Sequence, residues 1–187
     1  GDDEDDGDEE APRQPLRVLA SVGGGLSLRL SQTEEFTQET LAPGYVEVLG
    51  GVIFPSRSVR IRHGAGLAIA LNTDDDGSFF NGVGGGEQIV LAPTYLLRIQ
   101  LDDDPVPDYF LLAHVAVDAA LTAGNGDVAL GFEAGADFAY MFLAGLGAYG
   151  GVTFSTFLGA QDRSGSMSVH PLLSFEIGVL YDFEVLP

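Results

Sequence analysis

The stretch SFEIGVLYDF, residues 174–183, stands four residues from the end of the chain and alternates between two kinds of side chain. Successive side chains of a β-strand point to opposite faces, so this pattern predicts a strand with one apolar face. The apolar face carries Phe175, Ile177, Val179, Tyr181 and Phe183, and the opposite face carries Ser174, Glu176, Gly178, Leu180 and Asp182. The fold depends on which solvent the apolar face contacts.

Seven more segments of similar length precede this one and are separated from each other by turn signals. The eight predicted strand segments are 16–32, 44–54, 58–72, 88–101, 108–122, 127–141, 144–159 and 166–183. Each supplies the roughly 9–11 residues that a tilted strand needs to cross a bilayer, whereas strands of soluble proteins are usually about 5–6 residues long. No apolar run reaches the length of a transmembrane helix. The segments therefore predict eight membrane-crossing strands.

The polar faces of these segments combine small residues with isolated charges, which is typical of the crowded interior of a narrow barrel rather than of a solvated sheet. A buried charge must be paired, and Arg is suited to buried bidentate pairs. We therefore expect a filled, salt-bridged lumen, with His114 and Asp118 as a hydrogen-bonded pair. The predicted lumen network comprises Arg17, Arg29, Glu47, Arg60, Arg62, Arg98, His114, Asp118, Glu133, Asp137 and Glu176.

Composition and connections restrict the remaining possibilities. The chain has 187 residues, a formal charge of -20, eight Arg without any Lys, and no Cys, which argues against a nucleic-acid partner and against a disulfide framework. Residues 1–15 predict a disordered acidic tail and residues 16–187 a single barrel domain. The sequence begins without Met and without an apolar leader, which we interpret as a mature chain whose signal peptide has been removed. Longer and shorter connections tend to alternate, so both termini are expected on the periplasmic side.

The last strand also carries a motif. EIGVLYDF, residues 176–183, resembles the C-terminal assembly signal of bacterial outer-membrane barrels through Glu176, Gly178, Tyr181 and Phe183, and departs from it by continuing with EVLP. Over residues 16–183 the pattern resembles small eight-stranded barrels of the OmpA-like or OmpX-like family. The resemblance implies recognition by the barrel-assembly machinery and contact with outer-membrane lipid and lipopolysaccharide. The aromatic residues expected to form a girdle at one membrane interface are Phe54, Tyr109, Phe110, Phe138, Tyr140, Tyr181 and Phe183.

The expected fold class is thus all-β, an eight-stranded antiparallel up-and-down transmembrane β-barrel. Its expected function is that of an envelope structural protein, or of a membrane anchor or subunit of a larger assembly, without enzymatic activity, cofactor or metal. A protein partner is expected at the acidic tail or at the outer loops, where Phe79 and Phe80 are adjacent. The acidic clusters 74–77 and 102–105 are interpreted as solvated turns rather than Ca²⁺ sites.

Two other function classes remain open at this stage. A soluble, lipocalin-like barrel that carries an apolar ligand would show the same alternation with its faces inverted. A hydrolase acting on lipid A would use a His, Ser and acid set, for which His170, Ser174 and Glu176 are the candidates.

Overall fold

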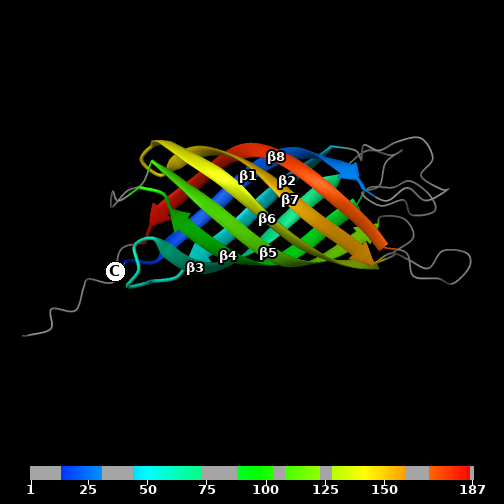
Figure 1. Ribbon diagram of the computed structural model, residues 1–187, viewed down its shortest axis with the longest axis horizontal. Helices are drawn as coiled ribbons and strands as arrows, with labels where there is room; N and C mark the ends of the chain where they lie inside the picture. Colours follow the sequence, from blue (N-terminus) through cyan, green and yellow to red (C-terminus); the bar gives the residue numbers. More distant parts are fainter. Residues whose placement is uncertain are drawn as a thin grey trace, which may run out of the picture.

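The computed structural model describes residues 14–30, 44–72, 88–102, 108–122, 128–158 and 169–185, and these form a closed antiparallel barrel (Figure 1). Its strands are β1 (Arg17–Arg29), β2 (Tyr45–Ile53), β3 (Ile61–Asn72), β4 (Gln88–Gln100), β5 (Tyr109–Thr122), β6 (Val128–Leu143), β7 (Leu146–Leu158) and β8 (Val169–Glu184). Each strand pairs with its neighbours in sequence, and β1 pairs with β8. The predicted fold class is confirmed. Within the described residues, no helix has the length and apolar character needed to cross a membrane.

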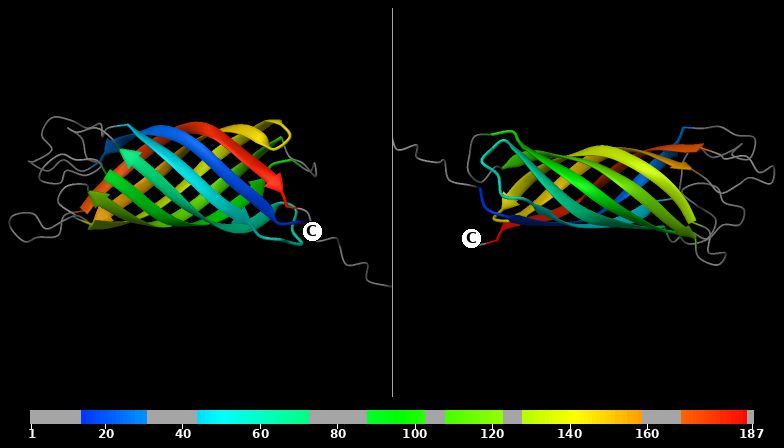
Figure 2. Two further views of the ribbon diagram at one scale, coloured as in Figure 1. Left: turned by 180° about the vertical axis from the view of Figure 1, so that it is seen from behind. Right: turned by 90° about the horizontal axis from the view of Figure 1, so that it is seen from below.

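Pairing of the first and last strands closes the barrel. The β1–β8 ladder runs from Arg17 opposite Glu184 to Arg29 opposite Leu172. Because β1 begins where β8 ends, the first and last strands enter and leave at one end, called here the terminal end (Figures 1 and 2). The opposite end is called the distal end. Gln14 and Pro15, which the sequence assigns to the tail, contact the terminal end, since Gln14 pairs with Ser56 and Arg62 donates a hydrogen bond to the Pro15 carbonyl.

Connections at the terminal end are short. Residues 54–60 join β2 to β3, residues 101–108 join β4 to β5, and the two-residue turn Ala144 and Gly145 joins β6 to β7. Gly145 has φ of 81°, a left-handed conformation that glycine adopts without the penalty of a Cβ atom. The stretches at the distal end, 31–43, 73–87, 123–127 and 159–168, lie outside the described residues.

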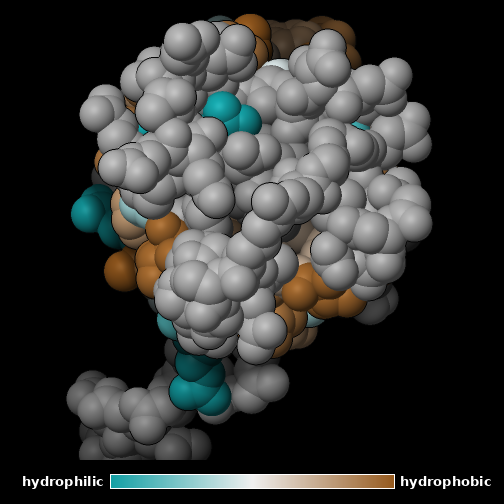
Figure 3. Space-filling view, turned by 90° about the vertical axis from the view of Figure 1, so that its right-hand side faces the viewer, coloured by the Kyte–Doolittle hydropathy of each residue, from teal (hydrophilic) through white to brown (hydrophobic). Residues whose placement is uncertain are grey.

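The outer face of the barrel is apolar on every strand. Side chains such as Val115 (50% exposed), Phe132 (55%) and Ile177 (75%) project from it. Apolar side chains are visible along the flanks of the molecule when it is viewed from the distal end (Figure 3). Within the eight strands no Arg, Asp or Glu occupies an outward-facing position, and the outward-facing imidazole of His63 lies near the terminal end of β3, where it is hydrogen-bonded to the Tyr95 hydroxyl. The structure therefore places the apolar face of the alternating strands outside.

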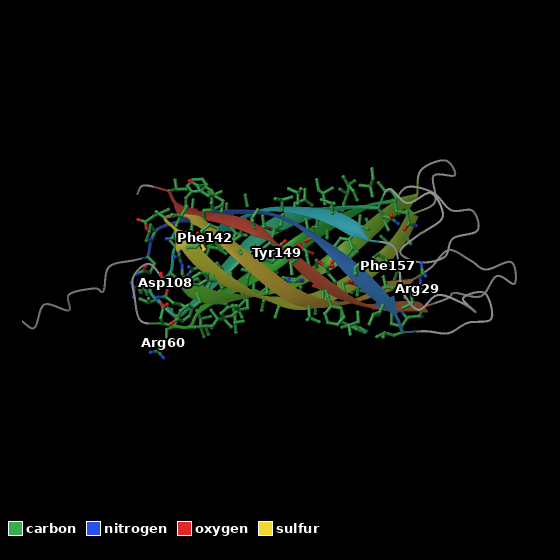
Figure 4. The ribbon with its side chains drawn as sticks, turned by 90° about the horizontal axis from the view of Figure 1, so that it is seen from above. Arg29, Arg60, Asp108, Phe142, Tyr149 and Phe157 are labelled. Carbon is green, nitrogen blue, oxygen red and sulfur yellow. The ribbon has the colours of Figure 1, made fainter. Side chains whose placement is uncertain are left out.

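The inner face is layered along the barrel axis. Towards the terminal end an apolar layer includes Leu19, Ile53, Leu96, Phe110 and Leu180, all of which are buried. Towards the distal end a second apolar cluster is formed by Ala70, Val90, Ala120, Ala129, Phe157 and Leu172. Figure 4 shows Tyr149 near the middle of the barrel and Phe157 nearer the distal end. Polar side chains occupy the space between the two clusters.

Phe110 corrects one part of the predicted aromatic girdle. Its side chain is fully buried in the lumen, whereas Tyr109 is 42% exposed. Adjacent residues of a strand point to opposite faces, so only one of the two can face outward. The other predicted girdle residues, Phe54, Phe138, Tyr140, Tyr181 and Phe183, are exposed on the outer surface.

Candidate functional site

An ion-pair cluster occupies the lumen at the terminal end. Arg17 Nε donates a hydrogen bond to Asp182 Oδ1 at 2.7 Å, and Arg98 Nη2 lies 3.3 Å from Asp182 Oδ2. The Arg98 guanidinium also lies 4.2 Å from the centre of the Phe110 ring, a distance typical of a cation–π contact. Arg17 Nη1 reaches Glu184 at the rim, 3.5 Å away. One buried carboxylate therefore holds two buried guanidiniums together.

Arg62 belongs to the same end of the barrel but uses backbone acceptors. Its Nη2 atom donates to the carbonyl oxygens of Pro15 and Phe54, the latter at 3.3 Å. It thereby ties the segment before β1 and the end of β2 to the start of β3. With its 3% exposure, Arg62 closes the lumen beside the Asp182 cluster.

The prediction that Arg60 faces the lumen is wrong. Arg60 precedes β3, which begins at Ile61, and its side chain is exposed at the outside of the turn (Figure 4). The alternation of a strand does not extend into a turn, so the position of Arg60 in the sequence did not determine its direction. Arg29 lies at the distal end, far from the other inward-facing arginines (Figure 4).

The carboxylates that the sequence assigned to the lumen gather in the middle of the barrel instead of alternating with arginines. A central acidic layer is formed by Glu47, Glu133, Asp137 and Glu176, which line one cavity together with His114. Glu176 accepts hydrogen bonds from the Tyr149 hydroxyl and, at 3.2 Å, from the Tyr45 hydroxyl. The predicted salt-bridged plug is therefore wrong in its arrangement, because these four carboxylates lie at a different level from the arginines, which pair at the terminal end with Asp182 instead.

His114 has different partners from the one predicted. Its Nδ1 atom lies 3.6 Å from Asp137 Oδ2, and its Nε2 atom lies 3.2 Å from the Thr153 hydroxyl. Asp118, the predicted partner, is four residues further along β5, which is roughly 13 Å along an extended strand. Asp137 lies on the adjacent strand β6, where Gly135 is the residue directly opposite His114. Neighbours across the sheet are closer than neighbours four positions apart in one strand.

Asp118 is fully buried on the inner face of β5, opposite Gly131. Neither of its carboxylate oxygens has a hydrogen-bond partner among the described residues. It lies two positions along β5 from Ala116, the residue opposite Glu133. Asp118 therefore extends the acidic layer towards the distal end.

Glycines give the central side chains their space. A Cβ atom on Gly23 would lie within 2.4 Å of Glu176 Oε1, and one on Gly151 would meet the Asp137 carboxylate. A Cβ atom on Gly178 would lie 2.6 Å from the Tyr149 ring. These glycines therefore leave room in the lumen for the Tyr149 ring and for the carboxylates of Glu176 and Asp137.

The cavity between these side chains has a volume of about 70 Å³. That is room for about five or six water-sized groups. Its remaining lining is partly apolar and includes Leu49, Ala70, Val90 and Leu172. The lumen is thus filled at the apolar layer of the terminal end, and the small acid-lined cavity beside it extends to residues of the distal apolar cluster.

Sequence reasoning missed three participants: Asp182 at the terminal end, and Tyr45 and Tyr149 in the central layer. Asp182 stands on the polar face of its strand, which is the signal that identifies its direction. Tyr45 is the first residue of β2, and Tyr149 lies near the start of β7. Nothing in the local sequence of either tyrosine indicates that it contacts Glu176.

The residues of the assembly motif divide between the two faces of β8. Tyr181 and Phe183 are exposed on the outer face, and their rings lie 5.2 Å apart between centroids. Glu176 and Gly178 face the lumen. Recognition by the assembly machinery stays a prediction. Phe79, Phe80 and the acidic cluster 74–77 lie outside the described residues, as do residues 1–13 of the predicted tail.

The fold has counterparts among solved structures. The attachment invasion locus protein Ail of Yersinia pestis matches with a TM-score of 0.51 and 9% identity, covering 91% of this chain and 100% of that chain. Neisserial surface protein A matches with a TM-score of 0.55 and 11% identity, covering 92% and 99%. No protein-family model and no curated protein matches the sequence. The chain has the fold of the small eight-stranded outer-membrane β-barrels, as its sequence pattern predicts.

Proposed function

We propose that this protein is an integral barrel of the bacterial outer membrane that serves as an envelope structural protein or as the membrane anchor of a larger assembly. The observation that carries the proposal is the outer face, which is apolar on all eight strands and has no Arg, Asp or Glu at an outward-facing strand position. An exposed apolar surface that surrounds the whole barrel is unfavourable in water, whereas a bilayer solvates it. Closure of the barrel satisfies the backbone hydrogen bonds that lipid cannot satisfy.

The filled lumen supports a structural role over a channel. The apolar layer around Phe110 and the cluster of Arg17, Arg98 and Asp182 occupy the interior at the terminal end. Eight strands leave an interior just wide enough for side chains. Passage of a solute would require these buried side chains to move together.

The two alternatives receive less support. A soluble ligand carrier needs polar side chains on the outside, whereas Val48, Phe132 and Phe175 are exposed there. For the hydrolase, Ser174 is buried and its hydroxyl shares a 2.7 Å hydrogen bond with the Ser27 hydroxyl, which is not a base that could activate a serine nucleophile. Our proposal therefore assigns the protein no catalytic activity.

The proposed orientation places the terminal end in the periplasm. The short connections 54–60, 101–108 and 144–145 lie at that end, and short periplasmic turns are typical of outer-membrane barrels. In this orientation a basic partner of the acidic segment 1–12 would be periplasmic, and the connection between β3 and β4, which includes Phe79 and Phe80 in the sequence, would be on the other side of the membrane. Deletion of residues 1–12 tests the partner: loss of a co-purifying basic protein would support the docking role, and unchanged co-purification would contradict it.

The decisive experiment is membrane fractionation combined with gel mobility. The chain is expressed behind a signal peptide, inner and outer membranes are separated, and samples are run with and without boiling. We expect recovery in the outer membrane and a boiling-dependent mobility shift. Recovery in the soluble fraction without detergent would contradict the proposal.

A further inference from the structure

Positive charge is concentrated at one turn of the terminal end. Residues 57–62 contain three of the eight Arg of the chain, and residues 48–73 contain no Asp or Glu. Arg62 points into the lumen, whereas Arg57 and Arg60 are exposed, and Figure 4 shows Arg60 at the outside of the turn. Arg57 and Arg60 are together called here the basic turn. Its charge contrasts with that of a chain that carries 28 acidic residues.

The chain that precedes β1 is attached beside this turn. Gln14 and Ser56 form an isolated antiparallel bridge, in which the Gln14 N–H donates to the Ser56 carbonyl oxygen at 2.8 Å and the Ser56 N–H donates to the Gln14 carbonyl oxygen at 3.3 Å. Arg62 donates to the Pro15 carbonyl oxygen. Gln14 therefore lies next to Arg57, the residue that follows Ser56.

The segment that leads to Gln14 has the opposite charge. Eight of residues 1–10 are Asp or Glu. Glu10 is four residues from Gln14 and Arg60 is four residues from Ser56, and four residues of extended chain span at most about 14 Å. Arg60 therefore lies no further from the bridge than Glu10 is able to reach.

Attachment to the same chain gives the acidic segment an advantage over a free anion. An ion pair between exposed side chains contributes only about 0–1 kcal/mol, so two guanidiniums do not hold a separate acidic molecule firmly. A short tether raises the effective concentration of the attached group to the order of millimolar. The bridge between Gln14 and Ser56 supplies this tether.

We propose that the acidic segment 1–12 docks on the basic turn of its own chain, through ion pairs between its carboxylates and the guanidiniums of Arg57 and Arg60. The contact is electrostatic, so salt weakens it. A basic partner of the acidic segment competes with the basic turn for the same carboxylates. The inference depends on the charges and the chain attachment at the terminal end, and not on the solvent outside the barrel.

The test is zero-length cross-linking of the whole chain in detergent micelles, followed by mass spectrometry. A carbodiimide joins a carboxylate to an amine that it contacts, and the chain has no Lys. Arg60→Lys keeps the positive charge and supplies one side-chain amine, which we expect to couple to carboxylates of residues 2–10. Arg29→Lys is the matched control without this product, since Arg29 lies at the distal end (Figure 4).

Salt and a competitor show whether the contact is electrostatic. We expect an about tenfold lower yield at about 1 M salt, where the screening length falls to about 3 Å. Added oligoarginine is expected to lower the yield as well. A mixture of isotopically labelled and unlabelled chains is expected to give products within single chains only.

The outcomes that would overturn the proposal are distinct from these. The Gln100 N–H donates to the Arg60 carbonyl oxygen, so the connection 101–108 is the neighbouring source of carboxylates. Coupling to that connection alone, a yield that salt does not change, or products between chains only would each contradict docking. Arg57→Lys is the second variant, and absence of products with residues 2–10 in both variants would contradict it too.

Discussion

The ring of Tyr149 lies over the backbone of Gly178 on the neighbouring strand, and its hydroxyl donates a hydrogen bond to Glu176. This contact explains why the C-terminal motif has a glycine at position 178 in this chain, because any side chain there would collide with the Tyr149 ring. The same contact joins β7 to the seam at which the barrel closes. It fixes the position of the central acidic layer relative to the last strand.

The first prediction concerns this contact. Gly178→Ala places a Cβ atom 2.4 Å from the Val22 carbonyl oxygen and 2.6 Å from the Tyr149 ring, so we expect it to destabilise the barrel by about 1–3 kcal/mol. The measurement is equilibrium urea unfolding in micelles. Gly50→Ala is the matched control, since a Cβ atom there meets nothing within 4 Å. Equal stabilities of the two variants would show that the ring does not need this space.

The second prediction concerns the terminal-end cluster. Asp182→Asn removes the charge that pairs with Arg17 and Arg98, and loss of one partner from a buried ion pair costs about 3–5 kcal/mol. The free energy of unfolding is measured in the same micelles. Glu184→Gln removes only the rim contact to Arg17 and is expected to cost at most about 1 kcal/mol. If Asp182→Asn were as mild as Glu184→Gln, the cluster would not stabilise the closed end.

The third prediction separates a lipid-facing wall from a water-facing wall. Val115 projects outward from the middle of β5. We expect Val115→Arg to destabilise the folded protein in bilayers by about 2–4 kcal/mol. The control is Val59→Arg in the turn between β2 and β3, where the cost falls to about 0–1 kcal/mol near the interface. Tolerance of arginine at both positions would support the soluble alternative.

The fourth prediction concerns transport. Because buried side chains fill the lumen at the terminal end, vesicles that contain the protein are expected to swell no faster in small sugars than empty vesicles. Vesicles that contain an open porin provide the positive control. Rapid swelling with the wild-type chain would contradict a filled lumen.

The sequence predicts the strands of this barrel well because both strand faces have a period of two residues. Predicted segments such as 88–101 and 108–122 differ from β4 and β5 by a single residue at one end. The direction of most charged side chains follows from the same period. Arg60 is the exception because it lies outside the strand. Phe110 obeys the period, and its place in the predicted girdle was wrong because two adjacent aromatics cannot share one face.

The partners inside the lumen depend on information that the period does not contain. Whether Glu176 meets an arginine or a tyrosine is decided by the height of each residue along the barrel axis, which depends on strand tilt and register. Asp182 and Glu176 share a face of β8, yet one pairs with arginines at the terminal end and the other with Tyr45 and Tyr149. The sequence therefore predicts which residues are inside, and the register determines the contacts between them.

The pairing of β1 with β8 has a consequence for biogenesis. The first strand pairs with the last strand. The backbone hydrogen bonds at the edges of the sheet therefore cannot all form until residues 169–184 have been synthesised. A chain interrupted earlier would present the open edges of β1 and β7 to lipid, which offers them no hydrogen bonds. The closed barrel therefore requires the complete polypeptide through β8.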